Sequence, residues 1–168
     1  DLWILIDVTK SDDTTAARVT SEVQTAIELL DTLSYWSFFN IGVYSSTSRL
    51  FSQRMLRASA DNKNAANEFL KTINATDVEF SNLKGMFDLL GSSRSSSIAS
   101  GDTSSCHEMV ALLAGTKNSF QWRDPVSDVS NLDVHILTYV FNFDESVVID
   151  SIYKDLACAT AGRVAEIH

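Results

Sequence analysis

The chain has 168 residues, of which 45% are hydrophobic and 21% are charged, enough for one sizeable core and too few for two ordinary domains. Its 22 acidic residues outnumber its 13 Lys and Arg residues and give a formal net charge of -9, which argues against a nucleic-acid partner because such surfaces concentrate cations. No apolar run approaches the roughly 20 residues that span a bilayer, so we expect no direct membrane insertion by this domain. The chain opens on a strand-like segment without a signal peptide, and we therefore expect one domain, residues 1–168, excised from a larger protein.

Strands and helices alternate in the first part of the chain. The apolar run 2–6 is typical of a strand covered on both faces, and apolar residues at helical spacing from Val19 to Leu33 follow it, behind polar N-cap candidates. The run 38–44 predicts a second strand, and a turn through "SSTS" leads into a short third strand at 49–52.

The middle of the chain predicts two helices and a long connection. One helix begins near Asp61 and carries apolar residues to Ile73, and another starts near Leu83 and ends at a C-cap on Gly91. The stretch that follows, 92–105, is rich in Ser and Gly and nearly free of apolar residues. Such a composition buries too little surface to offset the entropy of ordering, and it predicts a mobile loop.

Apolar runs at 109–114 and 134–141 predict two central strands in the last part of the chain. A helical pattern over 148–159 follows, stopped at Gly162, and a last strand is expected at 163–167. Strands that alternate with helices predict an α/β fold: a doubly wound, mostly parallel central sheet with helices on both faces.

The segment "DLWILIDVTKSDD" places polar oxygens at the end of the first strand. Asp7 is followed by hydroxyls at Thr9 and Ser11, and in open α/β sheets ligands gather outside the carboxyl ends of the strands. One carboxylate and two hydroxyls are ligands that hard divalent cations prefer. The same residues also suit a plain structural role, in which Asp7 and Thr9 cap a helix and hold a loop.

The spacing Asp-x-Thr-x-Ser resembles the first segment of the metal-ion-dependent adhesion site of von Willebrand factor type A (VWA) domains. The stretches 30–46, 134–141 and 155–167 are similar to those of the VWA domains in α2δ accessory subunits of voltage-gated calcium channels and their Cache-domain relatives. The resemblance implies a second metal loop with a hydroxyl at Ser81 and a third loop ending in an acid. Gly115 stands where that acid is expected, so the resemblance implies a degenerate site that binds Mg²⁺ or Ca²⁺ weakly or not at all.

The resemblance also implies the setting of the domain. It would be an extracellular protein-binding module of a larger membrane-anchored protein at the cell surface, with a protein partner such as a membrane channel or receptor. The sequon Asn74-Ala75-Thr76 agrees with a secreted glycoprotein. Cys106 and Cys158 are disulfide candidates, and a mutual disulfide, two free core thiols or a bond to another region of the parent protein all stay open.

The sequence contains no nucleophile elbow, phosphate loop or dinucleotide fingerprint, so we do not expect an enzyme. Two alternatives to the adhesion module follow. One is a metal-independent structural or assembly domain with a vestigial site. The other is a small-molecule-binding α/β domain, against which the lack of a Gly-rich phosphate turn counts.

Overall fold

The computed structural model describes residues 1–10, 14–103, 108–115, 125–130, 132, 134–142 and 149–167. These residues form seven strands and five helices. In chain order they are β1 (Leu2–Asp7), α1 (Thr15–Thr32), β2 (Phe38–Tyr44), β3 (Ser48–Leu50), β4 (Leu56–Arg57), α2 (Ala60–Lys71), α3 (Leu83–Ser100), β5 (Met109–Gly115), α4 (Pro125–Ser130), β6 (His135–Phe141), α5 (Ser151–Ala159) and β7 (Arg163–Ile167).

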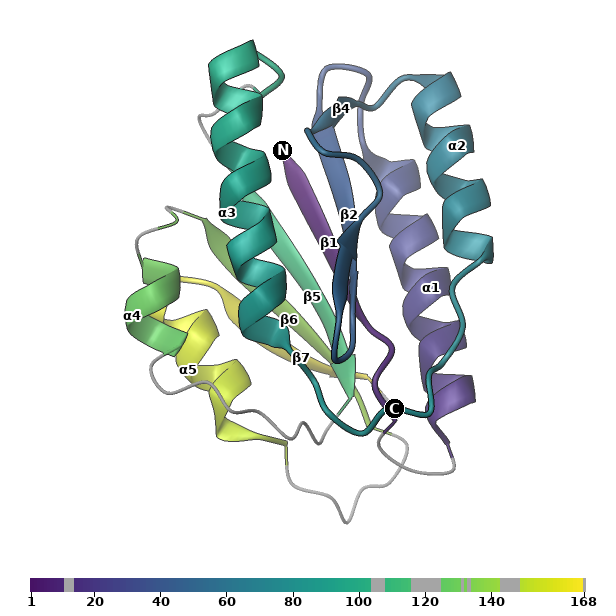
Figure 1. Cartoon of the computed structure of the whole chain (residues 1–168), viewed down its shortest axis with the longest axis vertical. Helices are drawn as coiled ribbons and strands as arrows, with labels where there is room; N and C mark the ends of the chain where they lie inside the picture. The colour runs from purple at the N-terminus through teal and green to yellow at the C-terminus, as the bar shows by residue number, and fades with distance from the viewer. Residues whose placement is uncertain are drawn as a thin grey trace.

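The strands form one sheet in the order β3-β2-β1-β5-β6-β7, with β4 paired to β2 beside β3. Neighbouring strands from β2 to β7 run parallel, whereas β3 and β4 pair antiparallel with β2. Figure 1 shows α1 and α2 over one face of the sheet and α3, α4 and α5 over the other. The predicted α/β architecture, with a mostly parallel sheet between two helical layers, is confirmed.

The central strand β1 explains why its sequence is apolar without alternation. Trp3 and Leu5 pack with α3 and α5, while Ile4 and Ile6 pack with α1 and α2 on the opposite face. Both faces are therefore core, as parallel sheets require. No helix among the described residues combines the length and apolarity needed to cross a membrane.

The prediction of a mobile loop over 92–105 is wrong for the part that the structure describes. Helix α3 continues through Gly91 to Ser100 and ends at Gly101, which has a φ of 72°. Serines extend the buried face of this helix beyond Leu90: the Ser93 hydroxyl donates to the Gln53 carbonyl at 2.8 Å, and the Ser97 hydroxyl accepts from the Met55 N–H at 2.9 Å. The entropy of ordering is thus offset by long-range hydrogen bonds as well as by apolar burial, which composition does not reveal.

Candidate functional site

The first strand delivers Asp7 to the carboxyl edge of the sheet. Asp7 is only 1% exposed, and its Oδ1 accepts a hydrogen bond from the backbone N–H of Thr9 at 2.9 Å. This Asx-type turn makes the chain leave the strand with Thr9 buried beside the strand end. Ser11, the third residue of the motif, lies outside the described residues.

Ser81 reaches the same edge through the segment that precedes α3. The Asn82 N–H donates to the carbonyl of Ser45, which follows β2, at 2.7 Å. The end of β2 is in turn paired with β1, where Tyr44 is opposite Asp7. Further along, the Thr76 N–H donates to the Val8 carbonyl at 3.0 Å. Hydrogen bonds therefore join the segment around Ser81 to the strand ends that carry Asp7.

Two hydroxyls at this edge have no hydrogen-bond partner among the residues that the structure describes. Thr9 Oγ1 and Ser81 Oγ are buried and accept or donate no hydrogen bond within the described part of the chain. A buried polar atom left unsatisfied costs about 1–3 kcal/mol, so two such atoms beside a buried carboxylate indicate a place that a ligand would complete. The candidate ligand atoms are all oxygens, the ligand type that hard divalent cations prefer.

The charge of the site is less favourable to a cation. Among the described residues, no group of three or more His, Cys, Asp or Glu side chains lies close enough to hold a metal ion. Asp7 is the only acid in the predicted ligand set. The oxygen donors of this arrangement are therefore those of a cation site, but they supply little negative charge.

Arg18 of α1 lies against Gly115, the position where the resemblance implies an acid. A Cβ atom on Gly115, the last residue of β5, would lie 2.9 Å from Arg18 Cδ and 3.0 Å from Arg18 Nε. The guanidinium is buried and donates to the carbonyl oxygen of Asp7 at 2.9 Å and to that of Thr9 at 2.5 Å. A side chain on residue 115 would collide with Arg18, so this buried cation occupies the space where the resemblance implies an acid.

Glu22, one turn further along α1, is the buried partner of Arg18. Its Oε1 accepts from Arg18 Nη1 at 2.5 Å, while its Oε2 has no hydrogen-bond partner among the described residues. Burial raises the pKa of Glu22 to about 8, although Arg18 opposes the shift. Burial, and after it the charge of Asp7, also raises the pKa of Tyr44 and Tyr153 well above the usual range, so both phenols stay neutral.

We expect the stability of the protein to fall between about pH 4.5 and pH 8 because of Glu22. A carboxyl whose pKa is raised in the folded state holds its proton there after the unfolded chain has lost it. Its contribution is complete below the unfolded pKa and is lost as pH rises through the folded one. The slope can reach about 1.4 kcal/mol per pH unit. In urea unfolding at pH 5, 6.5 and 8, the free energy of unfolding of Glu22→Gln should rise relative to that of the unsubstituted protein as pH increases.

The exposed Glu28→Gln on the same helix is the control for that pH series. If the free energies of unfolding of Glu22→Gln and of the unsubstituted protein differ by the same amount at all three pH values, Glu22 is ionised throughout and the expectation is wrong.

Sequence reasoning missed Arg18 and Glu22. Their (i, i+4) spacing was visible, but such pairs are usually read as exposed, and only the packing of α1 on the sheet shows that both are buried. Tyr153, whose hydroxyl donates to the Gly115 carbonyl at 3.1 Å, was missed for the same reason.

The remaining predicted residues lie away from this edge or outside the description. Asn74 is exposed before the loop of Ser81, and its glycosylation stays a prediction. Cys158 is exposed on α5 and carries a free thiol, so it is not a core cysteine. Cys106 lies outside the described residues.

Solved structures share this fold at low sequence identity. A von Willebrand factor type A protein from Catenulispora acidiphila superposes on 99% of the chain with a TM-score of 0.81 and 17% identity. The chain has the fold of a VWA domain. It spans 38% of the length of that protein. No protein-family model and no curated protein matches the sequence.

Two further VWA-like neighbours differ in how much of their length is matched. The conserved hypothetical protein BatB from Bacteroides thetaiotaomicron has a TM-score of 0.73 and 10% identity, and the chain covers 89% of it. Proximal thread matrix protein 1 from the mussel byssus, solved with zinc in its metal-ion-dependent adhesion site, has a TM-score of 0.64 and 11% identity over 43% of its length. At these low identities, the structural similarity shows a shared fold and no more.

Proposed function

We propose that this VWA domain is a protein-binding module whose contact surface is the loop edge around Asp7, Thr9 and Ser81. The observation that carries the proposal is the pair of buried, unpartnered hydroxyls beside the buried Asp7 carboxylate. The described part of the chain leaves such a site incomplete, and a bound group completes it. We assign the domain to binding proteins and not to enzymes.

The group that completes the site is a divalent cation, held by Asp7 and the hydroxyls of Thr9 and Ser81. Oxygen-only donors favour Mg²⁺ or Ca²⁺ over zinc, which prefers nitrogen and sulfur, although the mussel neighbour was solved with zinc in its adhesion site. When bound, the cation offers an open coordination position to a carboxylate of a partner. The affinity for the cation is low for two reasons. Asp7 is the only negatively charged member of the proposed ligand set, and the positively charged guanidinium of Arg18 repels the cation.

The setting of the module in a larger protein is part of the same proposal. The resemblance of the segments 30–46 and 155–167 to α2δ subunits and Cache-domain relatives supports an extracellular, membrane-anchored parent with a channel or receptor as partner. The exposed sequon at Asn74 agrees with that location.

Metal titration tests the proposal. The purified, chelator-stripped domain is titrated with Mg²⁺, Ca²⁺ and Mn²⁺ and followed by amide NMR shifts. We expect saturable shifts confined to residues near Asp7, Thr9 and Ser81, with a dissociation constant in the millimolar range, roughly that of weak extracellular calcium sites. Asp7→Asn should abolish them while keeping the turn, since an amide oxygen can still accept from the Thr9 N–H.

Asp31→Asn is the matched control, because Asp31 is an exposed acid at the far end of α1. Shifts that persist in Asp7→Asn, or that are equally lost in Asp31→Asn, would place cation binding elsewhere.

A metal-independent assembly role is the second candidate, and the contact between Arg18 and Gly115 favours it. In that case Arg18 already neutralises the site, and docking depends on direct polar and apolar contacts. Absence of any shift up to several millimolar cation, with partner binding unchanged by chelator, would select this alternative.

A further inference from the structure

An exposed cluster of aromatic rings surrounds one arginine at the amino-terminal end of β2. Trp36 is 74% exposed and Tyr35 is 56% exposed, and their rings meet edge to face with centroids 5.3 Å apart. The guanidinium carbon of Arg57 lies 4.8 Å from the ring centre of Phe38, 5.5 Å from that of Tyr35 and 5.7 Å from that of Trp36. We call Tyr35, Trp36, Phe38 and Arg57 the aromatic cluster.

The cluster lies at the opposite end of the sheet from Asp7. Phe38 begins β2 and pairs with Arg57 of β4, whereas Tyr44 ends β2 and pairs with Asp7. From Phe38 to Tyr44 the strand advances by six residue steps of about 3.3 Å each, or about 20 Å. The cluster is therefore a second surface, separate from the proposed metal edge.

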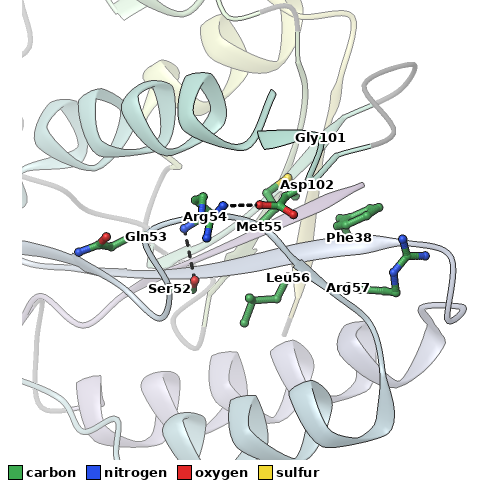
Figure 2. Close-up of a pocket in the computed structure, with 9 residues that line it drawn as sticks. All are labelled: Phe38, Ser52, Gln53, Arg54, Met55, Leu56, Arg57, Gly101 and Asp102. Carbon is green, nitrogen blue, oxygen red and sulfur yellow. Dashed lines mark hydrogen bonds and ion pairs between the residues drawn. The ribbon is translucent and has the colours of Figure 1, made fainter. Parts of the chain in front are cut away.

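A hollow of about 510 Å³ adjoins the cluster, and Phe38 and Arg57 line it. Figure 2 shows it between the end of α3, at Gly101 and Asp102, and the segment that leads into β4. Arg54 bridges the hollow to Asp102 with an Nη1–Oδ2 distance of 2.8 Å. Both partners of this ion pair are substantially exposed, so the bridge contributes little to stability and can open.

The charge here is opposite to that of the whole molecule. The lining of the hollow contains two arginines and one acid, in a chain with a net charge of -9. Arg54 is paired with Asp102, but the guanidinium of Arg57 lies over aromatic rings and forms no ion pair in the described part of the chain. A half-buried guanidinium held by rings and lacking a carboxylate is prepared to receive one.

We propose that the aromatic cluster and the adjoining hollow bind an acidic segment of a partner protein. A carboxylate of that segment pairs with Arg57, and an apolar side chain next to it packs on Trp36 and Tyr35. Tryptophan, tyrosine and arginine are the residues that dominate binding energy at protein interfaces, and the rings hold the guanidinium in place before binding. The net negative charge of the chain disfavours acidic segments over its surface in general, whereas the two arginines of this lining favour them here.

Calorimetric titration with two short peptides tests this surface. The probes are Ac-Asp-Glu-Leu-Asp-Glu-NH2 and its charge-reversed form Ac-Lys-Lys-Leu-Lys-Lys-NH2. We expect saturable binding of the acidic peptide alone, with amide NMR shifts at residues 35–38 and 54–57. Trp36→Ala and Arg57→Gln should each weaken binding about tenfold.

Arg49→Gln is the matched control, because Arg49 also lies over a ring, that of Phe69 at 5.0 Å, but is exposed elsewhere on the sheet. Asp7→Asn should leave peptide binding intact, which separates this surface from the proposed metal edge. Equal binding of both peptides, no binding, or binding that survives Arg57→Gln overturns the proposal. A dimer in sedimentation experiments that Trp36→Ala dissolves would also overturn it, since the occupant would be a second copy of the chain.

Discussion

Replacing Arg18 by methionine should lower the free energy of unfolding by about 3–5 kcal/mol, because three buried acceptors lose their donor and each unsatisfied group costs about 1–3 kcal/mol. Glu22 Oε1 loses its hydrogen-bond donor, and the carbonyl oxygens of Asp7 and Thr9 lose the guanidinium N–H groups that hold them. Most Glu22 already holds a proton at pH 7, because its pKa is about 8, so the loss comes chiefly from the two carbonyl oxygens, which no other described group would satisfy. Urea unfolding at pH 7 measures the loss.

Two further variants test whether the loss of stability is specific to the buried guanidinium of Arg18. Arg49→Met removes an exposed arginine that contacts a single ring, and it should change stability by less than about 1 kcal/mol. Arg18→Met combined with Glu22→Leu should recover part of the loss, because apolar groups of similar volume often replace a buried ion pair at little cost. A loss below about 1 kcal/mol in Arg18→Met alone would show that the guanidinium is not needed to support this edge.

Replacing Gly162 by alanine should be similarly damaging, with a loss of about 3 kcal/mol or more. A Cβ atom there would lie 1.7 Å from the carbonyl oxygen of Ile136, an atom of the β6 backbone that cannot move without disturbing the sheet. The Gly162 N–H also donates to the Ala157 carbonyl at 2.7 Å, so the turn from α5 into β7 would be displaced. Thermal or urea unfolding of the variant gives the measurement.

Gly91→Ala is the matched control for that substitution. Gly91 lies inside α3, and a Cβ atom there would meet only the end of the Leu132 side chain, at 3.3 Å. Alanine is the better helix former by about 1 kcal/mol, so Gly91→Ala should be neutral or stabilising. If Gly162→Ala were no worse than Gly91→Ala, the close approach to Ile136 would not limit the packing of α5 and β7.

The two glycines also show where sequence patterns mislead. The sequence pattern predicts a helix end at Gly91, but the left-handed residue that ends α3 is Gly101, and the helix between them has buried serines. The pattern also predicts that Gly162 stops α5, yet the residue with positive φ is Ala161, at 53°. Gly162 follows it and allows the chain to approach β6 closely. The local pattern finds a turn, whereas the reason for each glycine lies in a neighbour distant in sequence.

The sequence by itself determined the α/β architecture. Runs such as 2–6 and 38–44 are apolar at every position because both faces of a parallel sheet are buried, and the helices between them show their own period. It also placed Asp7 and Thr9 at a strand end, since the polar residue that follows such a run is local information. The short antiparallel strand β4 and helix α4 were not predicted, because two and six residues carry too little periodicity.

Only the tertiary structure decided what surrounds those oxygens. The segment of Ser81 is held at the edge of Asp7 by a hydrogen bond to the loop after β2. Arg18 fills the space beside Gly115 because α1 packs on the sheet next to the end of β5. The aromatic cluster likewise arises from pairing between Phe38 and Arg57. Local periodicity decides which face of a helix or strand is buried, but the partner of a buried charge or an exposed ring depends on how distant segments pack together.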